Sequence, residues 1–188
     1  MKKLLCIILA MLMLLSLAAC GKDKAKDGDK GDGGKQEVKG EIFDAGNVKA
    51  LAPKGWKAFP ANDIFAEDEN ATDPDVITIC KGAKDSFDML IKPLVRIDYY
   101  GPDTELWGGL EGLKEWYTDV QDLEPIVCDN YTWNGFTTTD YGLMAILVAV
   151  DGDIQIQASV YLETDGGKIS LEDADVLAIL NSIQPSEK

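Results

Sequence analysis

The segment LMAILVAVDGDIQIQASVYL, residues 143–162, decides the fold class of this chain. Residues 143–150 are apolar throughout, which is typical of a strand in the middle of a sheet. In residues 154–162, apolar Ile154, Ile156 and Ala158 alternate with polar side chains, as in a strand with one buried and one wet face. The intervening Asp-Gly-Asp is a turn sequence. We therefore predict an antiparallel hairpin at the centre of a sheet.

Further strands are predicted on both sides of this hairpin. Upstream, runs bounded by turn residues predict strands at 42–44, 48–51, 57–59, 76–80 and about 89–100, the last broken near Pro93. The acidic residues 61–75 between them are predicted to form a long loop. Downstream, residues 126–133 and 136–141 flank Asn134 and Gly135, a dipeptide that predicts a second hairpin.

Two helices complete the predicted fold. One begins near Thr104 and carries an apolar stripe at helical spacing: Leu106, Leu110, Leu113 and Tyr117. The other follows a capping box of Ser170 and Asp173 and is stopped by Pro185. Its apolar stripe is Val176, Ile179, Leu180 and Ile183. Strands with a few helices predict an α+β fold, an antiparallel β-sheet meander flanked by helices.

The chain resembles the PsbP/Mog1-like group of small α/β/α sandwich domains over about Val48 to Ile183. The resemblance rests on PKGW at residues 53–56, LEGLKEWY at 110–117, the two late hairpins and ILNSI at 179–183. It implies an accessory or binding domain, commonly non-enzymatic. Because the group has no universal catalytic set, no residue role is transferred.

The N-terminus resembles that of bacterial lipoproteins. MKK precedes an apolar run from Leu4 to Leu15, and LAAC at residues 17–20 matches the lipobox. The resemblance implies a signal peptide over residues 1–19, a diacylglyceryl anchor on Cys20 and a location at the extracytoplasmic face of the cell membrane. The alternative is one transmembrane helix, but the apolar stretch from Leu4 to Ala19, about 16 residues, is shorter than the roughly 20 that span a bilayer.

Charge divides the remaining chain into two parts. Residues 20–40 hold the cysteine and then mostly Gly, Asp and Lys, which predicts a flexible tether. Residues 41–188 have the length of one globular domain and hold 10 basic against 28 acidic residues, a net charge of −18. Such a domain should be repelled by nucleic acid and by anionic lipid.

The residue types present exclude several chemistries. The chain has no histidine, which removes the usual general base and the Ser-His-Asp and Cys-His triads. Once Cys6 is removed and Cys20 is lipidated, Cys80 and Cys128 remain. In an oxidising exported setting they could form a disulfide, or they could be two buried thiols.

The acidic loop is the best metal candidate. Asp68, Asn70, Asp73 and Asp75 offer the oxygen ligands that calcium prefers, although the EF-hand pattern fails because Asp73 stands where glycine is required. The alternative is a solvated acidic surface. No other cofactor is expected.

Two aromatic residues are the best contact candidates. Trp133 and Phe136 bracket the predicted turn at 134–135, where they could meet a ligand or partner, or pack into the core.

The functional hypothesis is a non-enzymatic, membrane-anchored binding or accessory domain for an envelope protein partner or a small ligand. The alternative is a carboxylate-based hydrolase of envelope glycan, because acids are plentiful. The solute-binding subunit of a transporter ranks last.

Overall fold

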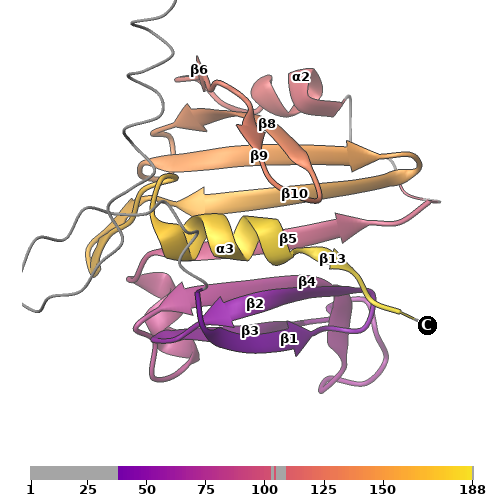
Figure 1. Ribbon diagram of the computed structural model, residues 1–188. Helices are drawn as coiled ribbons and strands as arrows, with labels where there is room; N and C mark the ends of the chain where they lie inside the picture. Colours follow the sequence, from indigo (N-terminus) through magenta and orange to yellow (C-terminus); the bar gives the residue numbers. More distant parts are fainter. Residues whose placement is uncertain (1–37, 103, 105–108, 188) are drawn as a thin grey trace, which may run out of the picture. The chain divides into compact units, whose positions relative to one another are not determined.

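Antiparallel sheets make up most of the fold (Figure 1). The computed structural model describes residues 38–102, 104 and 109–187. Within them the chain is rich in β-structure and has few helices, which confirms the predicted α+β class with an antiparallel sheet. None of the helices in these ranges is long and apolar enough to cross a bilayer.

The large sheet has the strand order β3-β4-β5-β10-β9-β8-β6, and β7 also pairs with β8. Its strands are β3 (Trp56–Asn62), β4 (Thr72–Lys81), β5 (Leu94–Tyr100), β6 (Gln121–Asp122), β7 (Ile126–Val127), β8 (Thr132–Thr138), β9 (Met144–Asp151) and β10 (Ile154–Tyr161). The small sheet has the order β1-β2-β13, with β1 (Gly40–Asp44), β2 (Val48–Pro53) and β13 (Gln184–Pro185). A third pair is β11 (Glu163–Thr164) with β12 (Gly167–Lys168). The helices are the 3-10 helix η2 (Ser86–Leu90), α2 (Gly109–Lys114) and α3 (Ala174–Ser182).

The hairpin predicted at residues 143–162 is confirmed. It consists of β9 and β10, with Asp151 opposite Ile154, and both strands have neighbours on their other side. Residues 144–149 of β9 are buried, as their continuous apolar sequence predicted. Gly152 adopts a φ of 58° in the turn.

The hairpin predicted at Asn134 and Gly135 is wrong, because both residues lie inside β8 and pair with Val148 and Leu147 of β9. A Cβ atom at Gly135 would lie only 2.1 Å from the carbonyl oxygen of Ile146. Glycine is therefore placed there for close approach of two strands and not for a turn. The chain instead reverses at residues 128–131, between β7 and β8.

The helix predictions hold in part. The helix predicted from Thr104 is described only as α2, because residues 105–108, including Leu106, lie outside the described ranges. The last helix buries its predicted stripe but begins at Ala174 and ends at Ser182, before Pro185. The predicted cap at Ser170 is wrong, because the N-cap residue is Asp173; the Ser170 N–H donates to Asp173 Oδ2 in the turn before the helix. The predicted loop at 61–75 is shorter, because β3 extends to Asn62 and β4 begins at Thr72.

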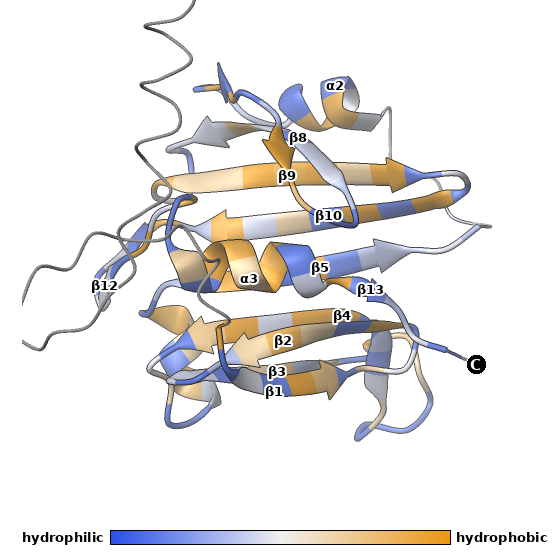
Figure 2. Cartoon of the chain, viewed as in Figure 1, coloured by the Kyte–Doolittle hydropathy of each residue, from blue (hydrophilic) through white to orange (hydrophobic). Residues whose placement is uncertain are grey.

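The main core lies between one face of the large sheet and a layer made by β2 and α3. Figure 2 shows the apolar residues that run along β9 and α3. Neighbouring residues of a strand point to opposite faces. Ile79 therefore belongs to the main core, whereas Cys80 belongs to a smaller cluster with Phe59 and Leu94 on the opposite face. A third cluster, around Phe136, lies next to Leu110 and Leu113 of α2.

Candidate functional site

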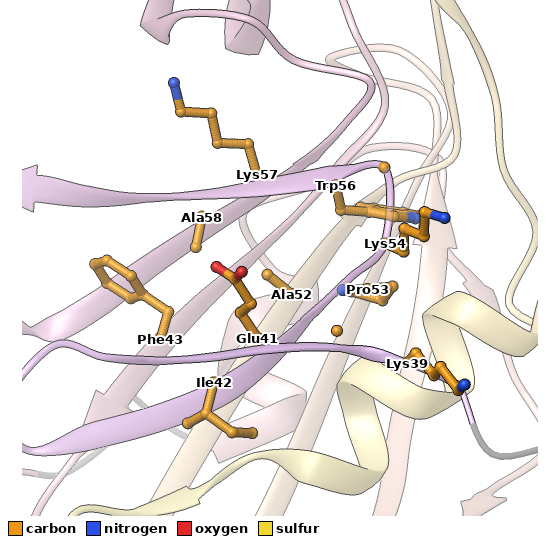
Figure 3. A pocket seen from close by; sticks show the side chains of 12 residues that line it. Lys39, Glu41, Ile42, Phe43, Ala52, Pro53, Lys54, Trp56, Lys57 and Ala58 are labelled. Atoms are coloured by element: carbon orange, nitrogen blue, oxygen red, sulfur yellow. The ribbon is translucent and has the colours of Figure 1, made fainter.

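A groove with a volume of about 630 Å³ opens between β1 and β3, the outer strands of the two sheets (Figure 3). We call it the edge groove; residues 39–43 and 52–58 line it. Its apolar residues include Phe43 and Ala58, which pack against the main core. The groove is therefore an opening onto the apolar layer between the two sheets.

The turn at residues 53–56 creates this groove. It carries the chain from β2 in the small sheet to β3 in the large sheet. β1 is the end strand of the small sheet and β3 an end strand of the large sheet, and both border the groove. Gly55 has a φ of 90°, a conformation that L side chains rarely adopt. A Cβ atom at Gly40 would lie 2.2 Å from the carbonyl oxygen of Ala52, so glycine allows β1 to approach β2 closely.

Lysines gather at the groove. Lys39 and Lys54 line it and are exposed, against one lining carboxylate, Glu41. Lys57 also belongs to the lining residues, but its ammonium donates to the Lys84 carbonyl oxygen, and Figure 3 shows its side chain directed away from Glu41. The backbone N–H of Lys54 donates to the carbonyl oxygen of Lys39 at 2.8 Å, which places these two lysines side by side. In Figure 3 the Glu41 carboxylate lies between the two strands. The lining is thus net positive in a domain of net charge −18, and it favours an anionic group.

The wall at Trp56 is fixed in place. Its side chain is 8% exposed, and its indole N–H donates to Asp175 Oδ2 at 3.0 Å, just inside the start of α3. The Lys81 ammonium lies 5.6 Å from the centre of the indole ring. The groove is therefore preformed on one side, which lowers the entropy cost of binding.

Each strand that borders the groove has one edge without a partner strand among the described residues. In β1, hydrogen bonds from Lys54 to Lys39 and from Ala45 to Val48 fix which residues face β2. By alternation, Gly40, Ile42 and Asp44 direct their backbone groups to the open edge. In β3 the corresponding edge is protected by Pro60 and by a bulge after it. Thus the edge of β1 that faces away from β2 can accept another strand.

The predicted contact residues Trp133 and Phe136 are fully buried, so the prediction that they contact a ligand or partner at the surface is wrong. They lie three residues apart in β8 and therefore point to opposite faces. Trp133 packs in the main core, whereas Phe136 packs edge-on against Tyr117 at 5.4 Å. Their burial follows from the misassigned turn, because a central strand has no exposed tip.

Of the two alternatives for the cysteines, a disulfide or two thiols, the structure has the thiols. Cys80 and Cys128 are both thiols and are not joined. Cys80 is fully buried in the cluster with Phe59, and burial raises its pKa. Cys128 packs against the main core, on the other side of the large sheet. The sheet therefore separates the two sulfur atoms.

The predicted calcium ligands do not converge. Asp68 and Asp73 each accept a hydrogen bond from the backbone N–H two residues on, at Asn70 and Asp75. Asp75 in turn accepts from the Asn47 side chain at 2.9 Å. Throughout the part of the chain that the structure describes, no three acidic, cysteine or histidine side chains form a metal-binding group. These carboxylates stabilise local turns.

Among the described residues, the carboxylates of Asp44, Asp88 and Asp140 have pKa values below their ordinary value. A general acid in a glycan hydrolase needs a raised pKa, so these three do not fit that role. Hydrogen bonds are the main cause, with Ser186 for Asp44, the Lys84 backbone for Asp88 and Thr118 for Asp140.

A second polar feature lies on the sheet face opposite the main core. Arg96 forms a fork with Asp98, with Nη2 to Oδ1 at 2.8 Å and Nε to Oδ1 at 3.0 Å. This hydrogen bonding raises the pKa of Arg96. Burial, followed by the charge of Asp98, raises the pKa of Tyr100. Because Arg96 and Asp98 neutralise each other, the edge groove is the better candidate for an anionic partner.

The remaining predicted site, Cys20, lies outside the described residues, as does the signal peptide predicted at 1–19. Of the predicted tether, only residues 38–40 are described, and Gly40 already belongs to β1. Sequence reasoning missed the edge groove. Its signal was the spacing of Lys39, Lys54 and Lys57 around the PKGW turn in an otherwise acidic domain.

Comparison with solved structures adds a likeness in the arrangement of the chain. No family model and no curated protein matches the sequence. A solved chain from Bacteroides thetaiotaomicron VPI-5482 is similar, with a TM-score of 0.45 and 11% sequence identity. The match covers 79% of this chain and 49% of that chain, so this chain spans about half the length of its structural neighbour.

Proposed function

We propose that this chain is a lipoprotein, held at the extracytoplasmic face of the cell membrane by Cys20, whose domain is a non-enzymatic binding module. The edge groove is its binding site, and the ligand is an extended acidic segment of an envelope protein. The observation that carries this proposal is the apolar, lysine-lined groove beside the open edge of β1.

Three features of the groove support an extended peptide. The open edge of β1 offers backbone groups to a strand, which is how β-strand addition gives affinity. The apolar lining accepts alternate side chains of such a strand, and 630 Å³ lies within the range of ligand pockets. Lys39 and Lys54 supply the charge complementarity that selects acidic partners.

We also propose that the fold is of the PsbP/Mog1-like α/β/α type. The turn at residues 53–56 joins the two sheets, and α3 packs with β2 on the main core. On the opposite face, α2 lies next to the cluster around Phe136. This arrangement supports an accessory or binding role without supplying a catalytic set.

Photo-cross-linking in the cell of origin tests the binding site. A photoreactive amino acid replaces Glu41, which lies in the groove, or Lys168, which is exposed outside it. We expect one recurrent protein adduct from position 41, lost when Lys39→Gln and Lys54→Gln are added, and none from position 168. Equal adducts from both positions contradict the proposal. Adducts of low mass only would contradict the peptide and show that the groove binds a small ligand.

The anchor is tested separately by Cys20→Ala in the full-length chain. We expect the wild type to incorporate labelled palmitate and to sediment with membranes, and the variant to do neither. Unchanged sedimentation of the variant would contradict the anchor while leaving the groove experiment valid.

A further inference from the structure

The 3-10 helix η2 presents apolar side chains to solvent. Phe87 and Leu90 are 78% and 81% exposed, and Ile91 is 48% exposed. Residues three apart eclipse one another on a 3-10 helix, so Phe87 and Leu90 form one apolar ridge. Met89 between them packs on the cluster of Phe59, Cys80 and Leu94 and fixes the helix to the sheet.

Exposed lysines surround this ridge. Lys84 precedes η2, and the Lys57 ammonium donates to the Lys84 carbonyl oxygen at 2.8 Å. Lys92 follows η2, and its ammonium donates to the carbonyl oxygen of Gly82, before η2, at 2.7 Å. This hydrogen bond joins the segments on the two sides of the helix. We call Phe87, Leu90, Ile91, Lys57 and Lys84 the η2 patch. It combines an apolar ridge with a cationic rim.

Two carboxylates also lie at the patch, and both already have partners. Asp85 accepts from the Phe87 N–H at 3.1 Å. Asp88 accepts from the Lys84 N–H at 2.6 Å and pairs with Lys92 at 3.1 Å. The Asp88–Lys92 pair is electrically neutral, so Lys57 and Lys84 outweigh the single charge of Asp85.

The chain leaves the domain toward its N-terminus at the same end. The Gly82 N–H donates to the carbonyl oxygen of Gly55 at 2.7 Å, so the strand end that leads to η2 lies next to the PKGW turn. Lys54 in that turn is hydrogen-bonded to Lys39, the residue before β1. Lys39, through Lys54 and Gly55, is therefore at the same end of the domain as Gly82, which precedes η2.

We propose that the η2 patch rests on the outer surface of the membrane that carries the anchor. Anionic headgroups meet Lys57 and Lys84, while Phe87 and Leu90 enter the boundary between headgroups and acyl chains. The net charge of the domain does not prevent this, because charges beyond about 8 Å are screened at physiological salt. This inference rests on the proposed membrane anchor and adds an orientation to it.

The opposite end of β3 supplies a matched control. Ile64 and Phe65, in the loop after β3, are 82% and 92% exposed. Residues 67–69 beside them are Glu-Asp-Glu, and Lys57 lies near the other end of β3, before residues 58–62 of that strand. If apolar exposure alone drove membrane contact, this loop would bind equally well. If lysines are also needed, the acidic loop stays in water.

A photoactivatable phosphatidylglycerol in vesicles that carry the lipidated full-length chain tests the orientation. We expect residues 84–91 to collect about tenfold more lipid adducts than residues 62–66. Phe87→Ser with Leu90→Ser should remove most adducts at 84–91, whereas Ile64→Ser with Phe65→Ser should leave them unchanged. Adducts spread evenly over both segments, or more abundant at 62–66, overturn the proposal.

A second preparation separates this result from the anchor. In this preparation a histidine tag replaces residues 1–20 of the chain. The tag binds a nickel-chelating lipid in the same vesicles, so the domain is held at the membrane without a lipidated cysteine. Preferential adducts at 84–91 in this preparation support the orientation even if Cys20 proves to be unmodified. Their absence overturns the orientation even if Cys20 is lipidated.

Discussion

The two ends of the large sheet differ in how far other strands cover them. At one edge β8 is covered by two strands of two residues each, β6 and β7, and Trp133 and Phe136 of β8 are fully buried. At the other edge β3 has seven residues and faces β1 across the lysine-lined edge groove. The chain therefore covers one edge with its own residues, the closed edge, whereas at the other it leaves a groove in which the neighbouring strand β1 of the small sheet offers an open edge. Stability should depend on the closed edge, and binding on the open one.

The largest effect is expected at the closed edge, from Trp133→Ala. It empties a fully buried site in the main core and should cost about 3–5 kcal/mol of the free energy of unfolding. Trp116→Ala is the control, because that side chain is 67% exposed, and should cost about 1 kcal/mol or less. Chemical denaturation measures both. Similar losses would show that Trp133 is not the core residue described above.

Two glycine substitutions compare β8 at the closed edge with β1 beside the edge groove. In Gly135→Ala the new Cβ would meet the Ile146 carbonyl oxygen between two paired strands, and about 2–3 kcal/mol of stability should be lost. In Gly40→Ala the clash is with the Ala52 carbonyl oxygen, but Gly40 begins an outer strand that can shift, so about 1 kcal/mol is expected. Thermal unfolding distinguishes them, and a larger loss at Gly40 would reverse the comparison.

Charge at the open edge should affect binding and leave stability nearly unchanged. Lys39→Gln with Lys54→Gln is expected to weaken binding of the cross-linked partner about tenfold, while stability stays within about 0.5 kcal/mol. Lys49→Gln with Lys168→Gln changes the net charge equally but lies outside the groove. Surface-immobilised binding assays measure all four substitutions. Equal weakening by the two pairs would indicate a general effect of charge.

The smallest effect concerns pH. Hydrogen bonds from the Lys84 backbone and from Lys92 lower the pKa of Asp88 below its ordinary 3.8. The stabilisation by this carboxylate is therefore complete above that value and is lost as pH falls through the lower folded-state pKa. Asp88→Asn should slightly lower the melting temperature near pH 7 and flatten its decline below about pH 4. An unchanged decline would mean that Asp88 does not contribute.

The sequence predicted the centre of the fold better than its edges. Periodicity identified β9, β10 and the buried stripe of α3, because burial on a sheet or helix face imposes a regular pattern. It failed at Gly135, since a glycine required for close strand approach has the same local sequence as a glycine in a turn. The edge groove was not predicted, because β1 and β3 lie in different sheets and only tertiary structure places Glu41 near Ala58.

Amide hydrogen exchange tests the central claim, that the open edge of β1 accepts a strand of the partner. The full-length chain is measured alone and with the partner recovered by cross-linking at position 41. The account predicts slower exchange at the amides of Gly40, Ile42 and Asp44, with no change in β6 and β7 at the closed edge. Unchanged exchange in β1, or protection confined to the closed edge, would contradict it.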